Sequence, residues 1–153
     1  MRAIVSLTIL LTTAVLMTGA GGIAPAIYVG HDKVNHTFGK RGPGNDGVIA
    51  DAPVKVSGNL RTGPGEAEVH ENEIDVFYVV SGGSTIVTGG KLTDPKRVNA
   101  TNLSGTNIED GTFQAMNKGD FLVVPQNTPH QITPSGGPII LMTVKMPRTT
   151  TAH

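Results

Sequence analysis

The chain has 153 residues, with 12 basic and 12 acidic side chains, 20 glycines, 10 prolines and no cysteine. This length fits one domain, and the glycine and proline content favours an all-β chain with many turns over a helical bundle. The balanced charge argues against nucleic acid as a partner, and the absence of cysteine excludes disulfides and thiolate ligands, so any metal must be held by histidine and oxygen ligands.

Residues 1–26 have the pattern of a secretory signal peptide. Arg2 precedes an apolar run over residues 3–17, which is too short to cross a bilayer comfortably, and small residues follow it. The A-x-A sequence that ends at Ala26 predicts cleavage before Ile27, and cleavage after Ala20 is the alternative. A retained single-span anchor is the competing interpretation. We therefore expect a secreted or periplasmic protein that has no membrane association after cleavage.

The remaining chain divides into an N-terminal segment (27–49), a β-domain (50–146) and a flexible tail (147–153). A short helix is predicted over Asp32–Phe38, and the glycine-rich stretch 39–47 ends it. In the β-domain, apolar alternation between turn signals predicts strands of a sandwich or barrel. These strands are expected near residues 54–60, 75–80, 84–88, 121–124 and 139–146. The polar stretch 91–111 predicts a hairpin extension or a loop at the barrel mouth.

An acidic segment lies between residues 66 and 75, and no lysine or arginine occurs from Thr62 to Gly90. Its carboxylates would repel one another unless they splay into solvent or share a cation. Because alternate residues of a strand share a face, Glu68 and His70 should point the same way, and Asp75 could face the same interior. The segment therefore offers part of a shell for a divalent metal ion, and a solvated acidic edge with a surface histidine is the alternative.

A second cluster runs from Gly119 to His130. It consists of a turn, an apolar strand, a turn bounded by Pro125 and Pro129, and then the histidine. The two prolines stiffen the backbone that presents His130, which suits a metal ligand.

Together these two segments resemble the cupin superfamily over about residues 50–146. Four residues fall on the two histidines, the glutamate and the final glycine of the first cupin motif: Glu68, His70, Asp75 and Gly82. In the second motif three residues match in place, and two others stand at its turn glycine and its last asparagine: Gly119, Pro125 and His130 match, with Asn127 and Pro134 as the departures. The resemblance implies a jelly-roll barrel, also called a double-stranded β-helix.

The resemblance also implies a metal site, with departures from the common cupin set of three histidines and one glutamate. Here the set would be Glu68, His70, Asp75 and His130. Two imidazoles with carboxylates resemble the facial arrangement that leaves positions open on Fe(II), and Mn, Ni or Zn would also fit. Glu68 could instead stay unligated and act as a general base beside a bound substrate. A metal-free cupin with a wet, polar barrel is the remaining alternative.

Other residues of the β-domain bear on the ligand. Phe77 and Val79 should share the interior face with Asp75 and give the pocket an apolar wall. Lys55 and Arg61 are expected to face solvent; if either faced inward, it could hold the carboxylate of a substrate.

The resemblance implies a metal-dependent enzyme that acts on a small organic molecule, by oxygenase, decarboxylase, isomerase or lyase chemistry. The alternative is a non-catalytic exported binder of a small ligand or metal. The set His70, Asp75 and His130 favours the enzyme, whereas the loss of the first histidine and the lack of an obvious inward basic residue favour the binder. Because cupins often dimerise, a homodimer is a further expectation.

Overall fold

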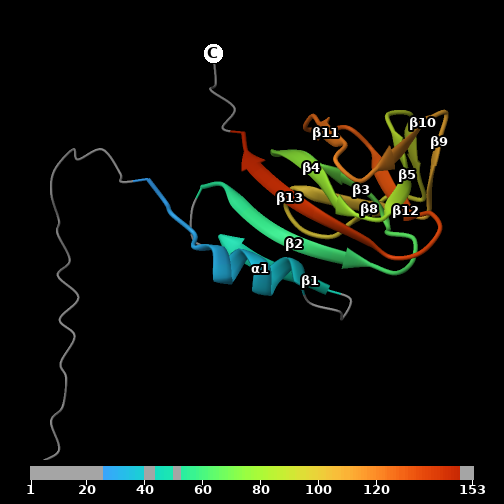
Figure 1. Cartoon of the computed structure of the whole chain (residues 1–153). Coiled ribbons are helices and arrows are strands. Elements are labelled where there is room, and N and C mark those ends of the chain that lie inside the picture. Colours follow the sequence, from blue (N-terminus) through green and yellow to red (C-terminus); the bar gives the residue numbers. More distant parts are fainter. Residues whose placement is uncertain (1–25, 40–43, 50–52, 149–153) are drawn as a thin grey trace, which may run out of the picture.

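The computed structural model describes residues 26–39, 44–49 and 53–148. Within these ranges two antiparallel sheets enclose a common core, and one short helix lies outside them (Figure 1). Residues 1–25 of the predicted signal peptide and residues 149–153 of the predicted tail lie outside the described residues. No helix in the described part of the chain is long and apolar enough to cross a membrane.

The first sheet has five strands and the second has six. In spatial order the first contains β1 (Gly44–Ile49), β2 (Lys55–Arg61), β13 (Ile139–Pro147), β4 (Glu73–Ser81) and β11 (Phe121–Val124). The second contains β10 (Thr112–Asn117), β5 (Gly83–Thr88), β12 (His130–Pro134), β3 (Ala67–His70), β8 (Asn102–Gly105) and β7 (Lys96–Arg97). A small extra pair is formed by β6 (Lys91–Thr93) and β9 (Asn107–Glu109).

The core lies between the two sheets and draws side chains from both. Val79 and Leu141 of the first sheet and Ile86 of the second are fully buried, and Phe77 is 2% exposed. Asp75 is also 2% exposed, so it shares the interior with Phe77 and Val79 as strand alternation predicts. Burial of each large apolar side chain contributes about 1.5–3 kcal/mol, which makes this cluster the main support of the barrel.

The predicted strands correspond closely to those observed, and the predicted helix is α1 (His31–Gly39). The glycine-rich stretch after it differs from the prediction, because β1 begins there and pairs with β2. Backbone hydrogen bonds at a sheet edge do not depend on apolar side chains, so the sequence pattern gives little sign of this strand. The polar stretch 91–111 forms four short strands, two of which extend the six-stranded sheet.

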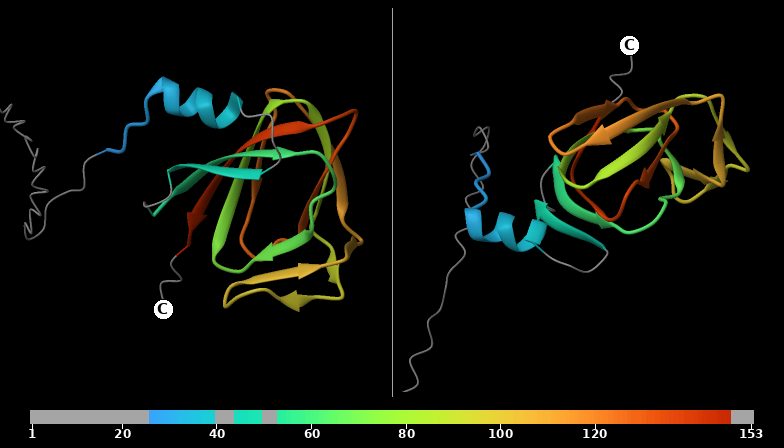
Figure 2. Two further views of the ribbon diagram at one scale, coloured as in Figure 1. Left: turned by 90° about the horizontal axis from the view of Figure 1, so that it is seen from below. Right: turned by 45° about the vertical axis from the view of Figure 1, so that its right-hand side comes forward.

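Helix α1 covers the outer face of β2 (Figures 1 and 2). A Cβ added at Gly58 would lie 2.8 Å from Cγ2 of Thr37 and 3.1 Å from Cδ1 of Phe38, so these two side chains rest directly on the strand. The face of β2 that carries Gly58 therefore meets the helix. The alternate face, which carries Lys55 and Arg61, points into the barrel.

Candidate metal centre

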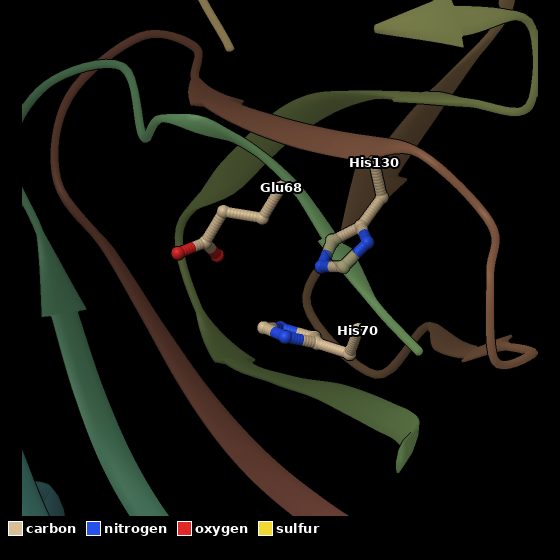
Figure 3. A group of neighbouring side chains, drawn as sticks. All are labelled: Glu68, His70 and His130. Carbon is tan, nitrogen blue, oxygen red and sulfur yellow. The ribbon is translucent and has the colours of Figure 1, made fainter. Parts of the chain in front are cut away.

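Glu68, His70 and His130 come together inside the barrel (Figure 3). Glu68 and His70 are alternate residues of β3, and His130 is the direct partner of Glu68 on β12. One ligand atom from each side chain lies within 4.8 Å of the other two. Both histidines are buried, at 7% and 4% exposure, and Glu68 is half-buried. The pairing of the two strands thus converts two distant sequence segments into one cluster.

The loop before β12 holds His130 in place. The backbone N–H of Asn127 donates to the carbonyl of His70 at 2.8 Å, and Asn127 has a positive φ of 61°. Asparagine tolerates this left-handed conformation better than most residues, so it can stand where the cupin motif has glycine. The loop is thereby tied to the strand that carries Glu68 and His70.

His130 has one ring nitrogen fixed and the other available. Its Nδ1 lies 3.2 Å from the carbonyl oxygen of Thr128, which fits an Nδ1–H donor and leaves the lone pair on Nε2. Burial lowers the pKa of His130, and the hydrogen bond to Thr128 only partly opposes this effect. The imidazole is therefore held neutral, which is the form that binds metals.

His70 has a different environment. Its Nδ1 is buried without a hydrogen-bond partner, while its Nε2 lies 2.9 Å from Nζ of Lys145 and 3.3 Å from Oδ2 of Asp75. Nε2 can accept from the lysine only in the neutral ring and donate to the carboxylate only when it carries a proton. Burial is the largest influence on the pKa of His70 and lowers it, as does the charge of Lys145. The hydrogen bond and the charge of Asp75, with a smaller contribution from Asn102, together raise the pKa above its ordinary value of 6.5.

Asp75 stands beside both histidines but is engaged by a lysine. Its two oxygens each lie 3.2 Å from Nζ of Lys145, and Oδ2 lies 3.6 Å from Nε2 of His130. Burial raises the pKa of Asp75, but the hydrogen bond to His70 and the charge of Lys145 lower it overall. Asp75 is thus paired with Lys145 and lies outside the group formed by Glu68, His70 and His130, and its assignment as a metal ligand stays a prediction.

Basic partners of the acidic segment come from distant parts of the chain. Arg97 forms two 2.9 Å hydrogen bonds with the carboxylate of Glu71, and Lys145 lies 3.4 Å from Glu73. The sequence reasoning missed Lys145 as a component of the site. A signal was present, because Lys145 is in phase along β13 with two fully buried residues, Ile139 and Leu141.

A cavity of about 410 Å³ adjoins the cluster. Three carboxylates line it, namely Glu68, Glu73 and Asp75, together with three basic side chains, namely Lys55, Arg61 and Lys145. Lys55 is exposed, as expected, and also lines the cavity, whereas Arg61 is half-buried in the cavity wall, which differs from the expectation that it faces solvent. The physical reason is the helix α1, which occupies the other face of β2 and turns the polar face toward the barrel.

The donor set of the cluster fits a divalent metal ion. Two ligands at about 2.1 Å from one ion stand at most about 4.2 Å apart, so a spread of up to 4.8 Å needs only small side-chain rotations. Two imidazole nitrogens and one carboxylate make the facial set that leaves coordination positions open. The buried Nδ1 of His70 makes no hydrogen bond of standard geometry, so it is available as the ligand atom of this ring.

No protein-family model matches the sequence, and no curated protein matches it. Solved structures are similar to it in fold. The Bacillus halodurans protein BH2720 is 15% identical with a TM-score of 0.59, covering 82% of this chain and 84% of its own. Hydroquinone 1,2-dioxygenase PnpCD, solved with Cd²⁺ and 4-hydroxybenzonitrile, is 12% identical with a TM-score of 0.55, covering 82% and 80%. A Klebsiella pneumoniae protein with a double-stranded β-helix domain is 19% identical with a TM-score of 0.52, covering 69% and 72%.

The two sheets, their antiparallel order and these neighbours define the class of the chain. It has the double-stranded β-helix fold, which is the fold that the resemblance to cupins implies. At these identities the similarity concerns the fold, and the function has to be argued from the site itself.

Proposed function

We propose that this protein holds a divalent metal ion between Glu68, His70 and His130 and uses it on a small organic molecule in the adjoining cavity. The observation that carries the proposal is the convergence of these three side chains within 4.8 Å inside a barrel. Support from the comparisons is the dioxygenase with the same fold, whose structure contains Cd²⁺ and a small aromatic molecule.

The chemistry would follow from the open coordination positions. A divalent ion held by these three residues supplies a Lewis acid for an oxygen of the substrate. His130 enters this set neutral and oriented by Thr128, and Asp75 fixes the ring of His70. Phe77 adds an apolar side chain to a cavity wall that is otherwise mostly polar. Oxygenase, decarboxylase, isomerase and lyase reactions are all compatible with such a centre.

Glu68 has a second role open to it. Its side chain lies at the cavity rather than in the core, so its carboxylate can accept a proton from a bound molecule when it does not ligate the ion. The Glu68→Gln variant distinguishes the two roles: a ligand is indicated by loss of the metal, and a general base by loss of turnover with the metal retained.

The first test is the metal content of the full-length protein by plasma mass spectrometry. We expect near-stoichiometric iron, manganese, nickel or zinc in the wild type, reduced about tenfold or more in the His70→Ala/His130→Ala double variant. His36→Ala is the matched control, because His36 is exposed on α1 outside the barrel. A wild type that contains no metal and takes up none of these ions when they are added contradicts the proposal.

One observation favours a second candidate, a non-catalytic binder. The ammonium group of Lys145 already contacts both Asp75 and His70, so a cation is present at the site without a metal. In that case the histidines only line a wet pocket. The measurement of metal content separates the metal centre from a metal-free binder, because in the metal-free binder loss of both histidines leaves the metal content unchanged.

A further inference from the structure

Arg61 is a cation without a partner inside the cavity. It ends β2 and lines the cavity wall, yet no hydrogen bond or ion pair joins its guanidinium to any residue in the described ranges, and its Nε is buried. Burial lowers the pKa of Arg61, although the charges of Glu68 and Asp75 oppose this effect. A partly buried charge without hydrogen bonds costs free energy, which a bound anion would offset.

The guanidinium of Arg61 lies against the backbone of Gly65. A Cβ placed on Gly65 would collide with Nη1 of Arg61, so the side chain lies directly against a residue that has none. Gly65 is itself fixed, because its N–H donates to the carbonyl of Ile132 at 2.9 Å and its carbonyl accepts from Nε2 of Gln131 at 2.9 Å. The strand position of Arg61 and the absence of a side chain at Gly65 together leave room for the guanidinium at this place in the cavity wall.

Lys55 is a second cation that lines the cavity, but its side chain is exposed. In the sheet it is the direct partner of Lys145, which in turn is the direct partner of Asp75 on the other side. Like charges placed opposite each other in neighbouring strands are unfavourable. Lys145 is compensated by Asp75 and Glu73, whereas Lys55 has no ion pair within the described part of the chain.

The net charge of the cavity indicates the charge of the ligand that it would bind. Three carboxylates and three basic side chains line it, so they balance before any ion is bound. Lys145 is paired with Asp75 and Glu73, and a metal would neutralise Glu68, which leaves Arg61 and Lys55 without an ion pair among the described residues. A bound divalent ion therefore makes the cavity positive, and the complement of such a cavity is an anion.

We infer that the cavity takes a small carboxylate anion, with Arg61 holding the carboxylate and Lys55 adding charge at the rim. A guanidinium presents two parallel N–H donors that match the two oxygens of a carboxylate. The remainder of the molecule would extend toward Glu68, His70 and His130 in a cavity of about 410 Å³. This inference rests on the proposed function, since it names the substrate class of the same site.

The test is isothermal titration of the full-length protein with acetate, pyruvate, succinate and benzoate, each paired with its uncharged amide. The titrations are run after removal of metal by a chelator and again after addition of Mn²⁺. We expect at least one carboxylate to bind about tenfold or more tightly than its amide. Arg61→Gln should weaken that binding about tenfold or more, and Arg61→Lys should weaken it less.

Two further variants keep the result interpretable. Gly65→Ala should displace the guanidinium and weaken carboxylate binding without removing any charge. It therefore tests the role of Arg61 independently if Arg61→Gln fails to fold. Arg148→Gln removes an exposed arginine at the end of β13 and should leave binding unchanged. The inference is overturned if no carboxylate of the panel binds, if the amides bind equally well, or if Arg61→Gln retains the wild-type affinity.

Metal content measured on the same samples separates this inference from the proposed function. Binding of carboxylate that depends on Arg61 in a protein that takes up no iron, manganese, nickel or zinc would support the anion site and contradict the metal centre. Uptake of Mn²⁺ without carboxylate binding that depends on Arg61 would support the metal centre and contradict the anion site.

Discussion

The ammonium group of Lys145 lies 3.2 Å from both carboxylate oxygens of Asp75, and the two residues are direct partners in adjacent strands. Asp75 is 2% exposed, so its charge depends on this neighbour. Burial alone would raise the pKa of Asp75, whereas His70 and Lys145 lower it. The lysine thus allows a charged carboxylate to stand inside the barrel beside two histidines.

Replacement of this lysine should destabilise the protein. Lys145→Met should lower the free energy of unfolding at pH 7 by about 2–4 kcal/mol, because it leaves Asp75 buried without its cation. The deficit should shrink toward pH 4, since without the ammonium group the carboxylate takes up a proton more easily. Urea unfolding at the two pH values measures both effects. Lys55→Met is the control and should change stability by less than about 0.5 kcal/mol; equal losses in the two variants would contradict this role of Lys145.

Glu68 is a candidate metal ligand, and the nearby Glu66 offers a matched control for it. They are acidic residues two positions apart, but Glu68 lies with the histidines while Glu66 is exposed outside the cluster. Glu68→Gln should reduce the affinity for Mn²⁺ about tenfold or more, because an amide is a far poorer ligand than a carboxylate. Glu66→Gln should leave the affinity unchanged. Titration calorimetry gives both values, and equal affinities would mean that Glu68 is not a ligand.

Most of the fold is predictable because it depends on local patterns. Apolar alternation marks β4, β5, β11 and β13, and glycines with positive φ stand where the cupin motifs place their turns, at Gly82 and Gly119. Strand β1 is not predicted, because its own sequence is rich in glycine and has little strand propensity. It is a strand because it pairs with β2.

The sequence predicts the candidate metal ligands but not the basic side chains around them, because the positions of the basic side chains depend on tertiary contacts. Motif spacing places Glu68, His70 and His130, and the strands bring them together as alternation requires. The inward position of Arg61 depends on α1 covering the opposite face of β2, and the position of Lys145 depends on the pairing of β13 with β4. Neither relationship has a signature in the sequence near the acidic segment.

The pH dependence of metal binding should follow His70. The pKa of His70 is raised above 6.5 and that of His130 is lowered, so as the pH falls His70 is the first of the two to bind a proton. Because a protonated imidazole cannot ligate, the affinity for Mn²⁺ should begin to fall before the pH reaches 6.5. Asp75→Asn removes the group that raises this pKa and should move the fall to lower pH.

Titrations of the wild type and the Asp75→Asn variant at intervals between pH 8 and pH 5 measure the shift. Glu66→Gln serves as the charge control and should follow the wild-type profile. Superposition of the Asp75→Asn and wild-type profiles would show that Asp75 does not control the protonation of His70.

Gly82, which falls on the final glycine of the first cupin motif, should be required because a side chain at this position would clash with backbone. Gly136 serves as the comparison, because it has a similar backbone conformation without such a clash. Gly82, between β4 and β5, and Gly136, between β12 and β13, have φ values of 81° and 73°. A Cβ at Gly82 would collide with the carbonyl oxygen of Pro138 and lie 3.0 Å from Cα of Ile139, whereas at Gly136 nothing lies within 4 Å. Gly136→Ala should therefore cost only the strain of a positive φ, about 1–2 kcal/mol, and Gly82→Ala should cost about 2 kcal/mol more, because backbone must move. Urea unfolding compares the two, and equal costs would mean that backbone conformation alone, without the contact to β13, determines the requirement for glycine.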